Sequence, residues 1–152
     1  MTNHVALIDH GVGNLRSVEK ALEAVGANVV LTRDAHTIIS AEKIVLPGVG
    51  AFGDCMQGMR SSGTLELVAR LARERPFLGI CVGMQMLFES SDEMGFHSGL
   101  GLLQGDVTRF TADDIRIHTL AGISWTLQGN ILCYMAFLLV VMRILTIVIA
   151  AG

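Results

Sequence analysis

The chain has 152 residues, which is enough for one domain with a sizeable buried core but too few for two. Its formal net charge is −3 and its Lys and Arg residues are scattered, which argues against a nucleic-acid-binding surface. Its cysteines, Cys55, Cys81 and Cys133, share no Cys-x-x-Cys spacing and follow no cleavable signal peptide. This composition argues against a disulfide framework or a zinc site, and it favours a cytoplasmic protein without a metal or a cofactor.

The first predicted element is a short apolar strand, Val5 to Ile8, which ends at Asp9 and a Gly11-Val12-Gly13 turn. Apolar residues then recur at helical spacing until Gly26. Further strands are predicted at Ala27 to Leu31, Lys43 to Leu46 and Phe77 to Ile80, with a helix at Leu65 to Arg75. This alternation predicts an α/β fold, a mostly parallel open sheet with helices on both faces, whose ligands bind at the carboxyl ends of the strands.

Two glycine-rich turns permit nucleotide-binding interpretations, and each departs from its motif. The Gly11-Val12-Gly13 turn would place the third glycine of a dinucleotide fingerprint at Arg16, whose side chain would crowd the packing of helix on strand. The loop from Gly48 to Gly53 carries no Lys-Ser or Lys-Thr pair, so it does not match a P-loop. We therefore do not expect a nucleotide site.

Cys81 lies between Gly79 and Gly83, at the point where an apolar strand gives way to a helical pattern. This pattern is typical of a nucleophile elbow with Cys in place of Ser, because a strained elbow residue needs neighbours whose side chains cannot clash with it. A following helix N-terminus would favour a thiolate, and the Val82 amide would point to the place where an oxyanion forms. A free cysteine is also often simply buried, so spacing alone leaves both interpretations open.

Four successive motifs resemble those of the glutaminase subunit of imidazole glycerol phosphate synthase, and they occur in the order of that family. They are Leu46-Pro47-Gly48-Val49-Gly50-Ala51-Phe52-Gly53; Gly79-Ile80-Cys81-Val82-Gly83-Met84-Gln85 with Phe88-Glu89-Ser90-Ser91; Gly99-Leu100-Gly101-Leu102; and Val107-Thr108-Arg109-Phe110. The resemblance implies a class I glutamine amidotransferase that hydrolyses glutamine through a thioester on Cys81. It also implies that the ammonia passes to a cyclase subunit in histidine biosynthesis.

The resemblance also implies roles for individual residues. The oxyanion hole would be formed by Val82, Gly50 and Val49, and glutamine would be held by Gln85, Glu93 and Gly48. Residues 9–14 would lie near the cyclase. Each role has a plain alternative, since the loop could be a tight strand-to-helix connection, Gln85 a solvent-facing helix residue and Glu93 one more exposed acid. Their joint occurrence with Cys81 favours a site.

Class I amidotransferases complete a Cys-His-Glu triad with a His-Pro-Glu segment, whose imidazole takes the thiol proton and later protonates ammonia. No His-x-Glu occurs in this sequence. His97 precedes the Gly-Leu-Gly-Leu turn and His118 lies where the family has a different segment, so neither replaces the triad histidine. We expect the chain as written to be catalytically incomplete.

A displaced reading frame accounts for this departure. Ile117 to Ile123 can be encoded as ATC CAC ACA CTG GCT GGA AT, and one C restored after the first codon gives Pro-His-Thr-Gly-Trp-Asn, the next motif of the family. The same frame can recover His-Pro-Leu-Leu-Tyr-Gly-Ile from Asn130 to Ala136, and Tyr-Phe-Xaa-His-Ser-Tyr from Arg143 to Val148. We therefore infer a single-base deletion near Ile117.

The chain divides accordingly into an amidotransferase part, residues 1–117, and an aberrant apolar tail, residues 118–152. From Ile131 to Ala150 the tail is almost continuously apolar and meets the length criterion for a membrane span, although Arg143 lies inside it. A tail-anchored membrane protein is therefore one alternative, although we expect no membrane association of native protein. A second alternative is a non-catalytic module that binds the cyclase and needs no triad.

Overall fold

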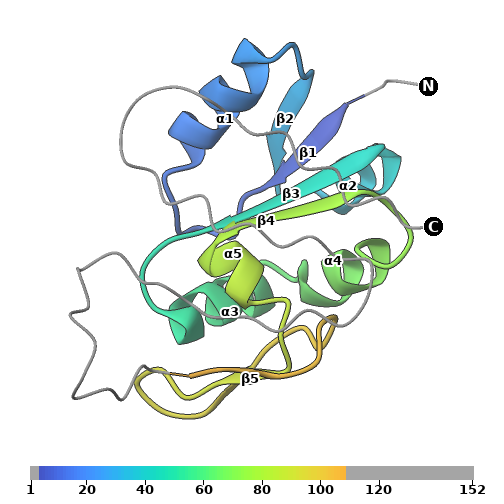
Figure 1. The fold of residues 1–152 in the computed structure, drawn as a ribbon. Helices are drawn as coiled ribbons and strands as arrows, with labels where there is room; N and C mark the ends of the chain where they lie inside the picture. Colours follow the sequence, from blue (N-terminus) through green and yellow to red (C-terminus); the bar gives the residue numbers. More distant parts are fainter. Residues whose placement is uncertain (1–3, 109–152) are drawn as a thin grey trace.

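The computed structural model describes residues 4–108, and these form one α/β unit (Figure 1). The expectations for the apolar tail, for the displaced frame and for the motif that ends at Phe110 lie outside the described residues. Within residues 4–108, no helix has both the length and the apolar character that a bilayer span requires.

A four-stranded parallel sheet organises the fold. Its strands are β1 (Val5–Ile8), β2 (Val29–Thr32), β3 (Lys43–Gly48) and β4 (Phe77–Cys81), in the order β2-β1-β3-β4. The central strands β1 and β3 are largely buried. Apart from the exposed Lys43 at the start of β3, they carry no charged or polar side chain, because helices cover the sheet on both sides. The predicted parallel sheet is confirmed.

The helices lie on opposite faces of this sheet. Helix α1 (Leu15–Ala24) covers one face beside β2, whereas the other face carries α3 (Phe52–Ser61), α4 (Leu65–Leu71) and α5 (Val82–Gln85) together with the short α2 (Ala35–Ser40) (Figure 1). The side-chain oxygen of Asn14 accepts from the Ser17 amide at the start of α1. Such caps satisfy amides that have no partner within the helix.

The main core lies between the sheet and helices α3 and α4. Its largest fully buried side chains include Leu46 of β3, Phe52, Met56 and Met59 of α3, and Leu71 of α4. Each such side chain contributes roughly 1.5–3 kcal/mol through burial. The core therefore holds α3 against α4 and α5 on this face of the sheet.

Four features differ from the sequence expectation. Strand β3 continues beyond Leu46 to Gly48, and α2 and α3 are additional helices. The predicted helix from Leu65 ends at Leu71 rather than Arg75, because the chain turns before Pro76. In this turn the backbone amides of residues 73–75 donate to the carbonyl oxygens of Arg70 and Leu71. A small second sheet, β6-β5-β7, is formed by Ser90–Ser91 (β5), His97–Ser98 (β6) and Asp106–Val107 (β7).

Candidate active site

Cys81 adopts the strained conformation expected of an elbow nucleophile. Its φ is 55° and its ψ is −121°, and only one other described residue that is not glycine, Met94, has a positive φ. Such a backbone is costly for a residue with a side chain and is found where surrounding structure imposes it. The Cys81 side chain is exposed at the end of β4, so the sulfur is accessible to a ligand.

The flanking glycines are required by backbone contacts. A Cβ at Gly83 would lie 2.0 Å from the Leu46 carbonyl oxygen, and one at Gly79 would lie 2.6 Å from the Met84 Cα. Both obstacles are main-chain atoms, which cannot rotate away. The absence of a side chain at Gly83 therefore lets the turn pack against β3, and its absence at Gly79 lets α5 fold back on β4.

The loop after β3 lies directly against the elbow. Gly48 pairs in register with Cys81, and a Cβ at Gly48 would lie 2.6 Å from the Gly83 backbone nitrogen. Val49 and Gly50 follow at the exposed side, where Gly50 has a φ of 84°. The structure thus brings Gly48, Val49 and Gly50 to the strand end that carries Cys81.

Helix α5, which begins at Val82, is shorter than the sequence pattern suggests. It comprises four residues, Val82–Gln85, so few peptide dipoles are aligned behind the elbow. Val82 is buried at its first position, and Gln85 is half-buried at its last. Val82 directly follows Cys81 and Gln85 lies one helical turn further on. The dipole of so short a helix stabilises a thiolate at Cys81 less than that of a long helix would.

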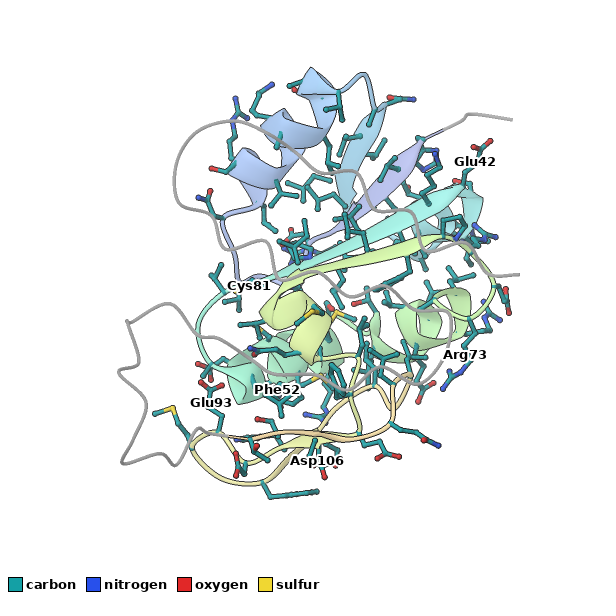
Figure 2. The ribbon with its side chains drawn as sticks, viewed as in Figure 1. Glu42, Phe52, Arg73, Cys81, Glu93 and Asp106 are labelled. Atoms are coloured by element: carbon teal, nitrogen blue, oxygen red, sulfur yellow. The ribbon has the colours of Figure 1, made fainter. Side chains whose placement is uncertain are left out.

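Glu93 contacts the far end of the loop. It is exposed in the connection between β5 and β6, and its carboxylate oxygen accepts a hydrogen bond of 2.8 Å from the Phe52 amide at the start of α3 (Figure 2). Ala51, the N-cap residue of α3, has no side-chain oxygen to offer, so Glu93 supplies this cap from 41 residues away. Glu93 therefore lies at the same loop as Gly48 and Val49.

The structure also places two residues here that the sequence analysis did not select. The His10 Nε2–H donates to the Pro47 carbonyl over 2.6 Å, and the Cys55 thiol donates to the Val49 carbonyl over 3.3 Å. Both residues are buried. Their chain positions carry a signal, because His10 follows a strand at its carboxyl end and Cys55 lies in the first turn after the loop.

The two described cysteines differ in environment. Burial raises the pKa of the Cys55 thiol to about 11, against an opposing contribution from hydrogen bonding with the Val49 backbone; the charges of Asp54, Cys81 and Glu93 raise it further. A thiol with this pKa is about one part in a thousand thiolate at pH 8. Cys55 is therefore protected both by burial and by protonation.

We expect Cys81 to be alkylated at least tenfold faster than Cys55 when folded protein is treated with iodoacetamide at pH 8. The reason is that Cys81 is exposed whereas Cys55 is buried and protonated. Mass spectrometry of the two peptides over time measures both rates. Unfolded protein serves as the control and should label both cysteines alike; equal rates in folded protein would refute the assignment of Cys81 as the reactive thiol.

Comparison with known proteins identifies the family. Residues 6–114 match the glutamine amidotransferase class-I family. The chain is 54% identical over 107 residues to imidazole glycerol phosphate synthase subunit HisH of Geobacter sulfurreducens, covering 70% of this chain and 51% of that protein.

Other relatives carry the same name. Identity is 51% over 107 residues to HisH of Geobacter metallireducens, covering 70% of this chain and 51% of that protein. Identity to HisH of Chromobacterium violaceum is 49% over 114 residues, which cover 73% of this chain and 53% of that protein. The chain thus spans about half the length of the curated relatives it matches. Since the family match covers most of the chain and includes the Cys81 elbow and its loop, the chain belongs to the class-I glutamine amidotransferase family.

Proposed function

We propose that this chain carries the nucleophilic half of a glutaminase subunit of imidazole glycerol phosphate synthase. The observation that carries the proposal is the strained, exposed Cys81 with the Gly48–Gly50 loop packed against its elbow. This arrangement suits attack on a carbonyl group, because a nucleophile and backbone amides from two segments meet at one strand end. The names of the relatives support the choice of reaction.

In this proposal the Cys81 thiolate attacks the side-chain amide carbon of glutamine. A carbon–sulfur bond forms while the carbonyl electron pair moves to oxygen, and amides of Val82, Val49 and Gly50 stabilise that oxyanion. Gly48, Gln85 and Glu93 hold the substrate. Collapse of the intermediate restores the carbonyl and breaks the carbon–nitrogen bond; the leaving nitrogen takes a proton from a general acid and departs as ammonia, which leaves a thioester on Cys81.

Both halves of the reaction need proton transfer, since an acid must protonate the departing nitrogen and a base must activate the water that clears the thioester. The sequence has no His-x-Glu segment, so we propose that the chain as written lacks the pair that normally protonates ammonia and activates water. The complete enzyme, with the reading frame restored, would clear the thioester and pass ammonia to a cyclase subunit. We place that enzyme in the cytoplasm, with glutamine and the cyclase as its partners and with no metal or cofactor.

A glutamine analogue with an activated γ-ester separates acylation from the missing proton transfer. A γ-glutamyl p-nitrophenyl ester loses p-nitrophenolate, which leaves without a proton, so Cys81 can be acylated even without a general acid. We expect a burst of about one p-nitrophenolate per chain followed by slow turnover, because the thioester accumulates. Stopped-flow absorbance measures the burst, and intact mass identifies the acyl group.

The control is Cys81→Ala, which should show no burst. Cys55→Ala should keep the amplitude of the burst at about one p-nitrophenolate per chain, whatever its rate, because Cys55 is buried behind the loop and is not the residue that is acylated. A burst that survives in Cys81→Ala, or an acyl group found on another residue, would overturn the assignment of the nucleophile.

A further inference from the structure

The loop of residues 47–52 is held from its buried side. His10 and Glu93 bind its two ends, as described above. Between them the Cys55 thiol donates to the carbonyl oxygen of Val49 over 3.3 Å. Cys55 is therefore the side chain that contacts the middle of the loop, next to the peptide that joins Val49 to Gly50.

We propose that Cys55 is a positioning residue of this site, whose thiol fixes the Val49–Gly50 peptide so that the Gly50 N–H faces the exposed side of the loop. This inference rests on the proposed function, since it takes the loop to be part of an oxyanion hole. Cys55 itself contacts the loop and not the reacting atoms.

Peptide geometry supports this orientation. In a trans peptide the carbonyl oxygen and the following N–H point in opposite directions. The Val49 oxygen points inward to Cys55 on α3, so the Gly50 N–H points away from α3. Val49 and Gly50 are both exposed, and Cys81 is exposed on the neighbouring strand end. This orientation leaves the Gly50 N–H free for a ligand on the exposed side of the loop, at the strand end that also carries Cys81.

The chemistry of the thiol fits a lasting donor. Burial raises the pKa of Cys55 to about 11, so its hydrogen stays on sulfur at neutral pH and remains available to the carbonyl. Gly50 has a φ of 84° and no side chain, so it does not itself restrain the orientation of the Val49–Gly50 peptide. Loss of this hydrogen bond should therefore let the peptide rotate.

The test compares Cys55→Ala, which removes the donor, with Cys55→Ser, which keeps a donor of similar size. Two reactions of Cys81 are measured in each variant: acylation by the γ-glutamyl p-nitrophenyl ester, which forms an oxyanion, and alkylation by iodoacetamide, which does not. Ser62→Ala is the matched control, because it removes a side-chain hydrogen bond to the Met59 carbonyl from the other end of α3.

We expect Cys55→Ala to slow acylation at saturating ester by about threefold to tenfold, the range for a single neutral hydrogen bond, without changing the concentration for half-saturation. The rate at which iodoacetamide alkylates Cys81 should be unchanged in Cys55→Ala. Cys55→Ser should be acylated at a rate within about twofold of the parent protein, and Ser62→Ala should match the parent in both reactions. Parental acylation in Cys55→Ala would overturn the proposal. Equal slowing in Cys55→Ser and Cys55→Ala would also overturn it, because packing rather than donation would then matter.

A second measurement separates this inference from the proposed function. The backbone amide of Gly50 is followed by NMR in ¹⁵N-labelled protein, with no ester present. Its resonance should broaden or double in Cys55→Ala and stay parental in Cys55→Ser. If the parent protein shows no burst that depends on Cys81, the proposed function fails, but the NMR spectrum still shows whether Cys55 fixes the Val49–Gly50 peptide. If the Gly50 resonance is unchanged in Cys55→Ala, the positioning role of Cys55 is refuted.

Discussion

Restoring one base after the codon for Ile117 should raise glutamine hydrolysis by about 100- to 10,000-fold over the chain as written. That range is typical for the loss of a general acid-base group, and we expect the restored frame, read on beyond residue 152, to supply the imidazole and its carboxylate. Cys81 and its loop are already assembled, so the restored chain needs only proton transfer and the supporting strands. Glutamate release in the presence of the cyclase subunit measures the rate.

Two controls make this comparison decisive. Cys81→Ala in the restored protein should abolish the gain, because the thioester cannot form without the thiol. The chain as written should accumulate acyl-enzyme with glutamine only slowly, since departing ammonia has no placed acid. Equal turnover by the written and restored chains would refute the displaced-frame interpretation, and no turnover by either would refute the proposed reaction.

Gly83→Ala should remove the acylation burst almost entirely. The new Cβ would lie 2.0 Å from the Leu46 carbonyl oxygen and 2.9 Å from the Pro47 carbonyl carbon, both main-chain atoms of β3. The elbow must therefore move away from the strand that it packs against. A displacement of about 1 Å at a reacting centre costs on the order of 100-fold in rate.

The same substitution should lower the free energy of unfolding by about 3 kcal/mol, at the upper end of the cost of overpacking. Urea denaturation measures that change, and the burst assay measures the loss of acylation. Gly26→Ala is the matched control, because Gly26 has a positive φ but nothing within 4 Å of its Cβ position. It should cost about 1 kcal/mol from backbone strain and leave acylation intact. A parental burst in Gly83→Ala would contradict the tight contact between elbow and strand.

Several parts of this protein were predictable from sequence because their cause is local. Strand β1 appears as an apolar run, since a largely buried strand has little place for polar side chains, and the half-buried β4 appears as a second such run. The elbow at Cys81 appears as glycines two residues to either side, because close backbone approach excludes any Cβ there. The motif order then indicated the family, which the match over residues 6–114 confirms.

Helix α3 shows where local pattern fails. It contains Gly53 and Gly58, which lower helix propensity, and it was not predicted. The structure explains both glycines, since a Cβ at Gly58 would lie 2.3 Å from the His10 carbonyl oxygen and one at Gly53 would lie 2.5 Å from the His97 ring. Tertiary burial of the Phe52 side of the helix, rather than propensity, therefore stabilises α3.

The loop beside the nucleophile is likewise a product of tertiary structure. Its motif residues were recognisable, but the side chains that hold it come from elsewhere: His10 is 37 residues from Pro47, and Glu93 is 41 residues from Phe52. No periodicity or spacing relates such distant positions. Sequence determined the strands, the elbow and the family because these depend on neighbours along the chain, whereas only the packed structure decided which side chains fix the loop, because those contacts form when separate segments meet.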